Sequence, residues 1–275
     1  MSLISKAPIF KSFTLALIQL RGSTANKADN LKHARELILK AATNPAKPQV
    51  VVLPEIFNSP YGHPQFPEYA EDIEYVPNKP YDVAQSKSES VKMLSSAAKE
   101  AGVWLIGGSI LEREPASDKI YNTCTVYNPQ GDLIAMHRKV HLFDIDIPGK
   151  ITFKESETLT GGTSLNFFDT DFARIGLGIC YDVRFPEMAM IAARNGCHML
   201  IYPGAFNLTT GPLHWELLQR GRALDNQMGK VLSEAGHDEE ITYTDIDPKV
   251  FEEARAWIPV TKQRRFDVYP DVSVQ

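Results

Sequence analysis

The sequence has few cysteines, no excess of basic residues and no long apolar run, and each shortage excludes a class of protein. Three cysteines among 275 residues are too few for a disulfide scaffold, and their odd number leaves at least one thiol free. The formal net charge of -5 argues against nucleic acid or an anionic membrane as the main partner. No run approaches the roughly 20 apolar residues of a membrane span. We therefore expect a protein of the cytoplasm, with mitochondria as the alternative compartment, that acts on a small molecule.

Strand-like and helix-like patterns alternate along the chain. A hairpin is expected over residues 122–139, turning at the sequence "NPQG", and a long polar stretch follows from 144 to 164. The alternation predicts one α/β domain over residues 1–275 with a mixed sheet. The expected strands are 13–20, 48–55, 103–110, 173–180, 198–204 and 241–247, and the expected helices are 26–42, 82–102, 186–196, 213–226 and 248–258.

Cys180 lies at a corner between a strand and a helix. It ends the apolar run "ARIGLGI" and precedes a polar turn and a proline that begins a helix-like segment. Such a corner holds a thiol near the free N–H groups of a helix start, where a thiolate and a developing oxyanion are both stabilised. Most free cysteines are only small buried hydrophobes, so Cys180 by itself is no more than a candidate nucleophile.

Two charged residues end other predicted strands. Glu55 closes "VVVLPE" and Lys139 closes "LIAMHRK". Each alone is typical of a solvated strand end or a structural ion pair. Ligands in open α/β sheets bind beyond the carboxyl ends of strands, however, so Glu55, Lys139 and Cys180 are expected to converge on one pocket. A carboxylate and an ammonium there supply the base and the positive charge that a thiol needs to attack at neutral pH.

Four motifs in this order resemble the nitrilase, or carbon–nitrogen hydrolase, superfamily. The Glu–Lys–Cys triad of that family matches "LPEIF" at Glu55, "HRKVHLFD" at Lys139 and "GLGICYDVRFPE" at Cys180, and "PGKITFKES" adds a second family glutamate, Glu155, 16 residues after the lysine. The omega-amidase branch is particularly similar through "HLFDIDIPGKITFKES" and "YPGAFNLTTGPLHWELLQRGRALDNQ", whereas deaminated-glutathione amidases look less alike there. The resemblance runs from about residue 13 to residue 269. It implies a four-layer α-β-β-α sandwich and a homodimer.

The resemblance also implies a mechanism that requires no metal and no organic cofactor. Glu55 would take the proton of Cys180, the thiolate would attack an amide carbon, and the oxyanion would lie between the Lys139 ammonium and the backbone N–H of Tyr181. Glu155 would orient Lys139 or position the substrate. Water activated by Glu55 would then hydrolyse the thioester.

The omega-amidase resemblance implies short dicarboxylate monoamides as substrates, such as alpha-ketoglutaramate and alpha-ketosuccinamate. Deaminated glutathione and N-carbamoyl amides are the alternatives within the family. Arg184 is the expected clamp for the distal carboxylate, although it can equally pair with an acid such as Glu187. The other candidate substrate-binding residues are Tyr61, Tyr181 and Phe206 as walls and Thr209 and Thr210 as hydroxyl donors.

Three other functions are weaker candidates. His137 and His141 are four residues apart, but on a strand and its exit they need not share a face, which argues against a metal hydrolase. A papain-like peptidase needs a histidine base and a different cysteine signature. An inactive homologue that serves as a scaffold has no support in the triad, all of which is present.

One departure from the family lies at "DNQMGKVLSEAG". In relatives, a strand, a loop and a second strand stand between "DNQ" and the "GK-V-EAG" segment, whereas here Gln227 meets Met228 directly. We expect two sheet strands to be missing at this junction, or the chain to show a physical gap or an anomaly between residues 227 and 228.

Overall fold

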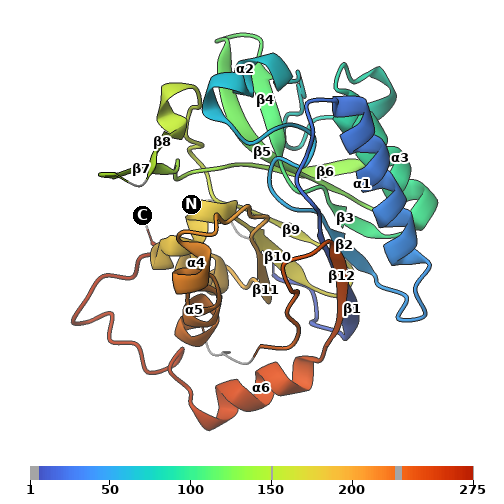
Figure 1. Cartoon of the computed structure of the whole chain (residues 1–275). Helices are drawn as coiled ribbons and strands as arrows, with labels where there is room; N and C mark the ends of the chain where they lie inside the picture. Colours follow the sequence, from blue (N-terminus) through green and yellow to red (C-terminus); the bar gives the residue numbers. More distant parts are fainter. Residues whose placement is uncertain (1–5, 150, 227–230, 275) are drawn as a thin grey trace.

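The computed structural model describes residues 6–149, 151–226 and 231–274. Two β-sheets pack face to face, and helices cover the outer face of each (Figure 1). The chain therefore forms an α-β-β-α sandwich, which confirms the predicted fold class.

The first sheet contains seven strands and is mixed, as the hairpin pattern predicted. Its strand order is β12-β1-β2-β3-β5-β4, and β6 pairs with β5. β1, β2 and β3 run parallel to one another, whereas β12, β4 and β6 pair antiparallel. The strands are β1 Phe13–Gln19, β2 Val50–Val52, β3 Trp104–Ile106, β4 Ile110–Glu114, β5 Lys119–Tyr127, β6 Leu133–Arg138 and β12 Glu240–Ile246.

The second sheet contains three described strands in the order β11-β10-β9. A separate two-stranded hairpin, β7 and β8, extends from the body of the molecule (Figure 1). The strands are β7 Asp144–Ile147, β8 Ile151–Lys154, β9 Asn166–Asp169, β10 Arg174–Leu177 and β11 Met199–Ile201.

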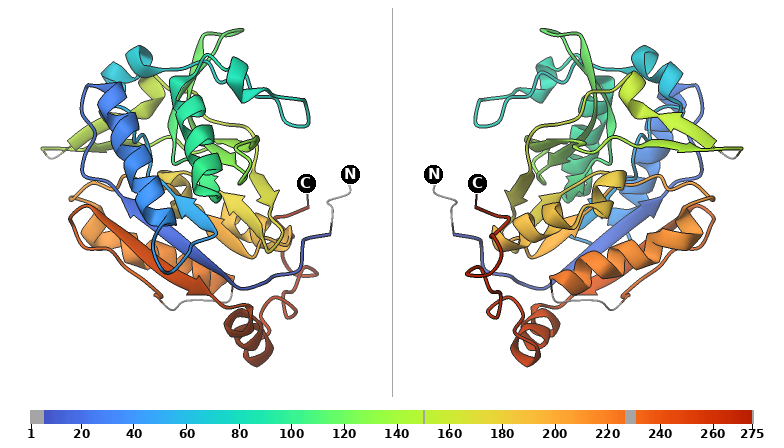
Figure 2. Two further views of the ribbon diagram at one scale, coloured as in Figure 1. Left: turned by 90° about the vertical axis from the view of Figure 1, so that its right-hand side faces the viewer. Right: turned by 90° about the vertical axis from the view of Figure 1, so that its left-hand side faces the viewer.

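The helices divide between the two outer layers. α1 and α3 lie side by side over the first sheet, whereas α4 and α5 lie over the second, and α6 projects from the body (Figure 2). The helices are α1 Lys27–Ala42, α2 Phe66–Tyr69, α3 Glu89–Ala101, α4 Pro186–Arg194, α5 Gly211–Asp225 and α6 Pro248–Trp257.

Alternating side chains of the first sheet build two separate cores. In β1, Leu15 packs against the second sheet and Ala16 against the helices. β2 repeats this pattern, because Val50 and Val52 enter the space between the sheets and Val51 faces the helices. A strand with a buried residue at every position must be covered on both faces. The run "VVV" therefore reflects the position of β2 in the middle of the sandwich.

Several predicted elements are shorter than expected, and local structure explains two of them. The helix expected over 82–102 begins only at Glu89, since the Ser88 hydroxyl accepts a bond from the Val91 N–H and caps the helix there. The strand expected over 103–110 ends after Ile106, because the chain turns at Gly108, which has φ of 62°. The polar stretch 144–164, for which no strand or helix was predicted, contains the β7–β8 hairpin.

The predicted anomaly between residues 227 and 228 lies outside the described residues. On their carboxyl-terminal side, residues 231–236, which belong to the family motif, form no strand. Among the residues that the structure describes, no helix is long and apolar enough to span a membrane.

Candidate active site

Glu55 lies three residues beyond β2, in a loop that is pressed against the next strand. The backbone of Ile56 has φ of 45°, in the left-handed region, and its N–H bonds to the Ser109 hydroxyl at 3.0 Å. Gly108 has φ of 62°, and a Cβ added there would lie 2.1 Å from the carbonyl oxygen of Pro54. These contacts turn the Glu55 side chain inward, where the residue is only 3% exposed.

Lys139 directly follows β6, and its backbone N–H extends the pairing with β5 through a 2.8 Å bond to the Asn122 carbonyl. Its Nζ lies 2.9 Å from Glu55 Oε1 and 2.9 Å from Glu155 Oε2, and all three side chains are fully buried. Burial alone would lower the pKa of Lys139, but the Glu55 and Glu155 carboxylates raise it above the usual value. The lysine is therefore a fixed ammonium between two acids, as a buried charge requires.

Glu155 begins the short turn after β8 and has hydrogen-bond donors at both carboxylate oxygens. The backbone N–H of Phe143 bonds to Oε2 at 2.8 Å. Oε1 receives the Tyr61 hydroxyl at 2.7 Å and Lys139 Nζ at 3.0 Å. The base of the β7–β8 hairpin is thereby tied to the buried lysine.

The Glu55 carboxylate is set up to accept a proton. Oε1 accepts bonds from Asn122 Nδ2 at 2.9 Å and from Lys139, and Oε2 accepts the Ala205 N–H at 3.0 Å. Burial raises the pKa of Glu55 above its usual value, and the nearby Glu155 charge raises it further against the opposing effect of Lys139. A carboxylate with a raised pKa is a better general base towards a thiol.

Cys180 begins a short 3₁₀ turn, Cys180–Arg184, that follows β10. Its backbone has φ of 44°, an uncommon left-handed conformation for a residue other than glycine. The turn is held by a 2.8 Å bond from the Cys180 N–H to the Pro203 carbonyl and a 2.9 Å bond from the Ile179 N–H to Asp182 Oδ2. The strained position is thus fixed by its neighbours.

The charges around the Cys180 thiol oppose one another. Burial raises its pKa well above the usual value and the Glu55 carboxylate raises it further, whereas Lys139 and the Ala205 N–H lower it. The resting thiol is consequently protonated at neutral pH, and formation of the thiolate requires transfer of its proton to a base. Glu55 is the carboxylate beside it.

A buried aspartate supports the turn that carries Cys180. Asp182 Oδ1 lies 2.8 Å from His141 Nδ1, and Oδ2 lies 3.4 Å from His137 Nε2. Burial would raise the pKa of Asp182, but hydrogen bonds from the two histidines hold it well below the usual range. Among the described residues, no group of three or more His, Cys, Asp or Glu side chains is arranged to hold a metal ion. Both histidines contact the Asp182 carboxylate.

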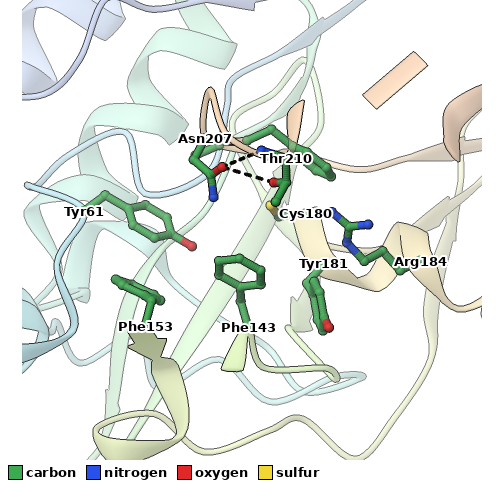
Figure 3. Close-up of a pocket in the computed structure, with 10 residues that line it drawn as sticks. Tyr61, Phe143, Phe153, Cys180, Tyr181, Arg184, Asn207 and Thr210 are labelled. Carbon is green, nitrogen blue, oxygen red and sulfur yellow. Dashed lines mark hydrogen bonds between the residues drawn. The ribbon is translucent and has the colours of Figure 1, made fainter. Parts of the chain in front are cut away.

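A cavity of about 240 Å³ opens onto Cys180 and is walled mainly by aromatic rings (Figure 3). The cavity adjoins the cluster of Glu55, Lys139 and Glu155, because Tyr61 lines the cavity and also donates a hydrogen bond to Glu155. The lining residues are Tyr61, Phe143, Phe153, Cys180, Tyr181, Arg184, Ala205, Phe206, Asn207 and Thr210.

Arg184 supplies a positive charge to the wall of this cavity. Its guanidinium carbon lies 5.5 Å from the centre of the Tyr181 ring and 5.4 Å from that of Phe206. Nη1 is 3.2 Å from His214 Nδ1, while Nε is buried and has no hydrogen-bond partner among the described residues. In the described part of the chain, Arg184 forms no ion pair with Glu187. The guanidinium therefore retains capacity to bind an anion in the cavity.

The structure brings together most of the residues singled out from the sequence. Tyr61, Tyr181, Phe206 and Thr210 line the cavity, whereas Thr209 is exposed and does not. Sequence reasoning missed five contributors. These are Phe143, Phe153, Ala205 and Asn207 in the cavity wall and Asn122, which donates to Glu55.

Comparison with known proteins agrees with this arrangement. The family model described as carbon-nitrogen hydrolase matches residues 14–228. Omega-amidase NIT2 of Danio rerio is 49% identical over an alignment that covers 96% of this chain and 98% of that protein. Omega-amidase NIT2 of Homo sapiens is 50% identical, covering 94% of this chain and 97% of that protein. The crystal structure of Saccharomyces cerevisiae Nit3, a member of branch 10 of the nitrilase superfamily, matches with a TM-score of 0.82 and 43% identity, covering 93% of this chain and 97% of that chain.

The alignment with the Danio rerio protein also bears on the shortened segment. It extends over 290 positions, whereas 96% of 275 residues is 264, so about 26 aligned positions have no residue of this chain. A gap of that length has room for two strands and their connection at roughly 3.3 Å per strand residue.

Proposed function

The chain belongs to the carbon–nitrogen hydrolase family, as its motifs predicted, and on that premise we propose that it is an omega-amidase. It hydrolyses the terminal amide of short dicarboxylate monoamides, such as alpha-ketoglutaramate and alpha-ketosuccinamate, to the dicarboxylate and ammonia. The observation that carries this proposal is the position of the Arg184 guanidinium in the wall of the cavity that opens onto Cys180. A substrate with an amide at one end and a carboxylate at the other matches these two groups.

The first half of the reaction forms a thioester. Glu55 takes the proton of the Cys180 thiol, and the sulfur attacks the amide carbon to form a C–S bond. The carbonyl oxygen becomes an oxyanion between the Lys139 ammonium and the Tyr181 backbone N–H. Glu55 returns its proton to the nitrogen, the C–N bond breaks, and ammonia leaves. Acylation thus needs one residue that both accepts and donates a proton, which suits the raised pKa of Glu55.

The second half of the reaction uses water in place of the thiol. Glu55 takes a proton from a water molecule, and the hydroxide attacks the thioester carbon. The same oxyanion site stabilises the second tetrahedral intermediate, the C–S bond breaks, and the sulfur recovers the proton from Glu55. The products are a carboxylic acid and the free enzyme. Glu155 orients Lys139 throughout, since both of its carboxylate oxygens contact Nζ, at 3.0 Å and 2.9 Å.

Substrate selection rests on the cavity wall. The guanidinium of Arg184 binds the distal carboxylate, with two parallel hydrogen bonds available from its planar fork. Aromatic rings of Tyr61, Tyr181 and Phe206 pack against the short carbon chain. The Thr210 hydroxyl, which donates to Asn207 Oδ1 at 3.1 Å in the structure, turns to donate to a substrate oxygen.

A panel of amides tests this function. Ammonia release is measured from alpha-ketoglutaramate, alpha-ketosuccinamate, deaminated glutathione, glutamine and N-carbamoyl-beta-alanine. We expect the two keto-acid monoamides to have the highest kcat/KM. Preference for deaminated glutathione or N-carbamoyl-beta-alanine would replace the proposal with another activity of the family, and no release from any of them would indicate an inactive homologue.

The enzyme is proposed to act as a homodimer. Support comes from the family resemblance and from α5, whose Leu213, Leu217 and Leu224 are each 68–69% exposed. Apolar side chains at this exposure favour burial against a partner. Light scattering coupled to gel filtration measures the mass, and a monomer at micromolar concentration would contradict this assembly.

We assign the enzyme to the cytoplasm, with mitochondria as the alternative compartment. The supporting observation is that Cys124, Cys180 and Cys197 are all free thiols. Fractionation of cells that express the tagged chain tests this assignment, and recovery in the secreted fraction would contradict it.

A further inference from the structure

Tyr61 lies beside the catalytic carboxylates as well as in the cavity wall. Its ring packs against Phe153, with ring centres 5.8 Å apart, and edge-on against Phe66 at 5.8 Å. Figure 3 shows the hydroxyl directed away from the backbone and into the cavity. A wall residue needs only the ring, so the hydroxyl calls for a separate explanation.

The hydroxyl contacts the same two oxygens that contact the lysine. Tyr61 donates its proton to Glu155 Oε1 at 2.7 Å, and its oxygen lies 3.3 Å from Glu55 Oε1. Lys139 Nζ is bonded to each of these oxygens, at 3.0 Å and 2.9 Å. Two carboxylates, one ammonium and one hydroxyl therefore form a closed group of four. A hydroxyl has a single proton, so the short bond to Glu155 determines which acid it serves in the resting state.

The two acids have different tasks during the reaction. Glu55 must gain and lose a proton beside Cys180, whereas Glu155 must remain an acceptor for Lys139. Glu55 and Glu155 carry like charges and share the Lys139 ammonium. A proton that enters this pair can settle on either carboxylate. The additional donor at Glu155 favours its carboxylate form and leaves Glu55 as the acid that changes protonation.

We infer that Tyr61 is a positioning residue whose hydroxyl holds Glu155 on Lys139 and thereby directs the proton of Cys180 to Glu55. This inference deepens the proposed amidase mechanism and rests on it for the identity of the proton acceptor. The hydroxyl can serve in this way over the working pH range, because burial, together with the Glu55 and Glu155 charges, raises the pKa of Tyr61 well above its usual value. It remains a donor whenever the enzyme is folded.

The Tyr61→Phe variant tests the role, with Tyr75→Phe as the matched control. Tyr75 also donates through a partly buried hydroxyl, to the Ile134 carbonyl at 2.8 Å, but it lies outside the cavity lining. A hydrogen bond to a charged group supports an expected fall in kcat of about 10- to 100-fold for Tyr61→Phe, with KM changed less than about 2-fold. Tyr75→Phe should leave both values unchanged. A change in KM alone would make Tyr61 only a wall residue and overturn the inference.

The pH profile supplies a second readout. The groups that face Glu55 are Lys139, Glu155, Cys180 and Tyr61, with Asn122 and the Ala205 N–H as neutral donors. Removing the hydroxyl removes a group that favours ionised carboxylates in this cluster, so the acid limb of kcat/KM should move to higher pH. An acid limb at the wild-type position would contradict the role.

Alkylation of Cys180 separates this inference from the proposed function, because it needs no substrate. The rate of modification by iodoacetamide is followed on the Cys180 peptide by mass spectrometry across pH. Tyr61→Phe should slow the reaction at neutral pH and displace its pH profile, and Tyr75→Phe should not. If no amide is hydrolysed but this displacement occurs, the proposed function fails and the inference stands. If Cys180 in the Tyr61→Phe variant is alkylated at the wild-type rate, the inference is overturned.

A double-mutant cycle with Glu155→Gln tests the route. Because Tyr61 acts through the Glu155 charge, Tyr61→Phe should slow Cys180 alkylation much less in the Glu155→Gln background than in the wild type. If Tyr61→Phe slows alkylation equally in the two backgrounds, the hydroxyl acts through a group other than Glu155. Thermal melting of all four proteins checks that each is folded before the rates are compared.

Discussion

The nucleophile is the residue on which the proposed chemistry depends most. Cys180→Ala removes the atom that forms the thioester, so ammonia release should fall by several orders of magnitude while the melting temperature changes little. The matched control is Cys197→Ala, since Cys197 is also a buried free thiol but lies outside the cavity lining. It should keep its activity. Wild-type enzyme mixed with substrate should show an acyl adduct on Cys180 by mass spectrometry, and retained activity in Cys180→Ala would exclude the mechanism.

Arg184 decides which end of the substrate is recognised. Arg184→Lys keeps the positive charge but loses the planar fork, so KM for alpha-ketoglutaramate should rise about 10-fold or more, as loss of a charge-assisted hydrogen bond implies. KM for a neutral short amide serves as the internal control and should change far less. An equal rise for both substrates would assign Arg184 to structure.

At the scale of single residues, the sequence contained enough to predict the charged centre. Glu55, Lys139 and Cys180 each follow a strand within three residues, and strands of a sandwich end at common edges. The role of Tyr61 could not be predicted in the same way. Its hydroxyl meets Glu155 only because the loop after Glu55 and the end of β8 pack together, and no spacing in the sequence reports that contact.

At the scale of elements, the turn that carries Cys180 depends on one buried charge. Asp182 accepts the Ile179 N–H and both His137 and His141, as described above, and an amide cannot accept all of these bonds. Asp182→Asn should therefore lower the free energy of unfolding by about 2–4 kcal/mol and reduce kcat, since it leaves buried donors unpaired. Asp118→Asn is the control, because Asp118 is 81% exposed and its ion pair with Arg113 is worth little. Equal stability in both variants would refute this role.

The contribution of Asp182 to the free energy of unfolding depends on pH in a defined direction. Its pKa is depressed in the folded protein, so its stabilising contribution is complete above the unfolded value of about 4 and is lost as the pH falls through the lower folded value. The difference in stability between wild type and Asp182→Asn should accordingly narrow in acid. Denaturant unfolding at neutral and acidic pH measures this difference.

Sequence patterns did not predict the β7–β8 hairpin, whose apolar residues face the cavity. The stretch 144–164 reads as polar, yet Phe143, directly before β7, and Phe153, within β8, form one wall of the cavity. Their rings pack with each other at 5.9 Å and with residues far away in the chain, such as Tyr61. A hairpin whose apolar side covers a cavity shows too few apolar residues to be distinguished from a loop by periodicity.

At the scale of the whole molecule, the alternation of strands and helices was sufficient to predict the layers. Residues such as Val50, Val51 and Val52 are apolar in succession, and only a sheet covered on both faces buries them all. The division of strands between the two sheets was not predictable from local pattern, because it depends on pairing between distant segments such as β1 and β12.

The shortened segment affects the edge of the second sheet. β11 is the end strand of this sheet and pairs only with β10 among the described residues, and nearby Val231 and Leu232 are 41% and 49% exposed. An open edge beside apolar side chains favours aggregation. We expect the chain to bind the dye ANS and to form, beside the proposed homodimer, larger species without a defined size. A chimera that replaces residues 226–231 with the longer corresponding segment of the Danio rerio protein should bind less dye and melt several degrees higher, since added strands cover that edge.

An insert of equal length made of glycine and serine is the control and should produce neither change, because such a chain stays a flexible coil. A soluble chain of one defined size, without dye binding, would show that the two strands are dispensable for this fold.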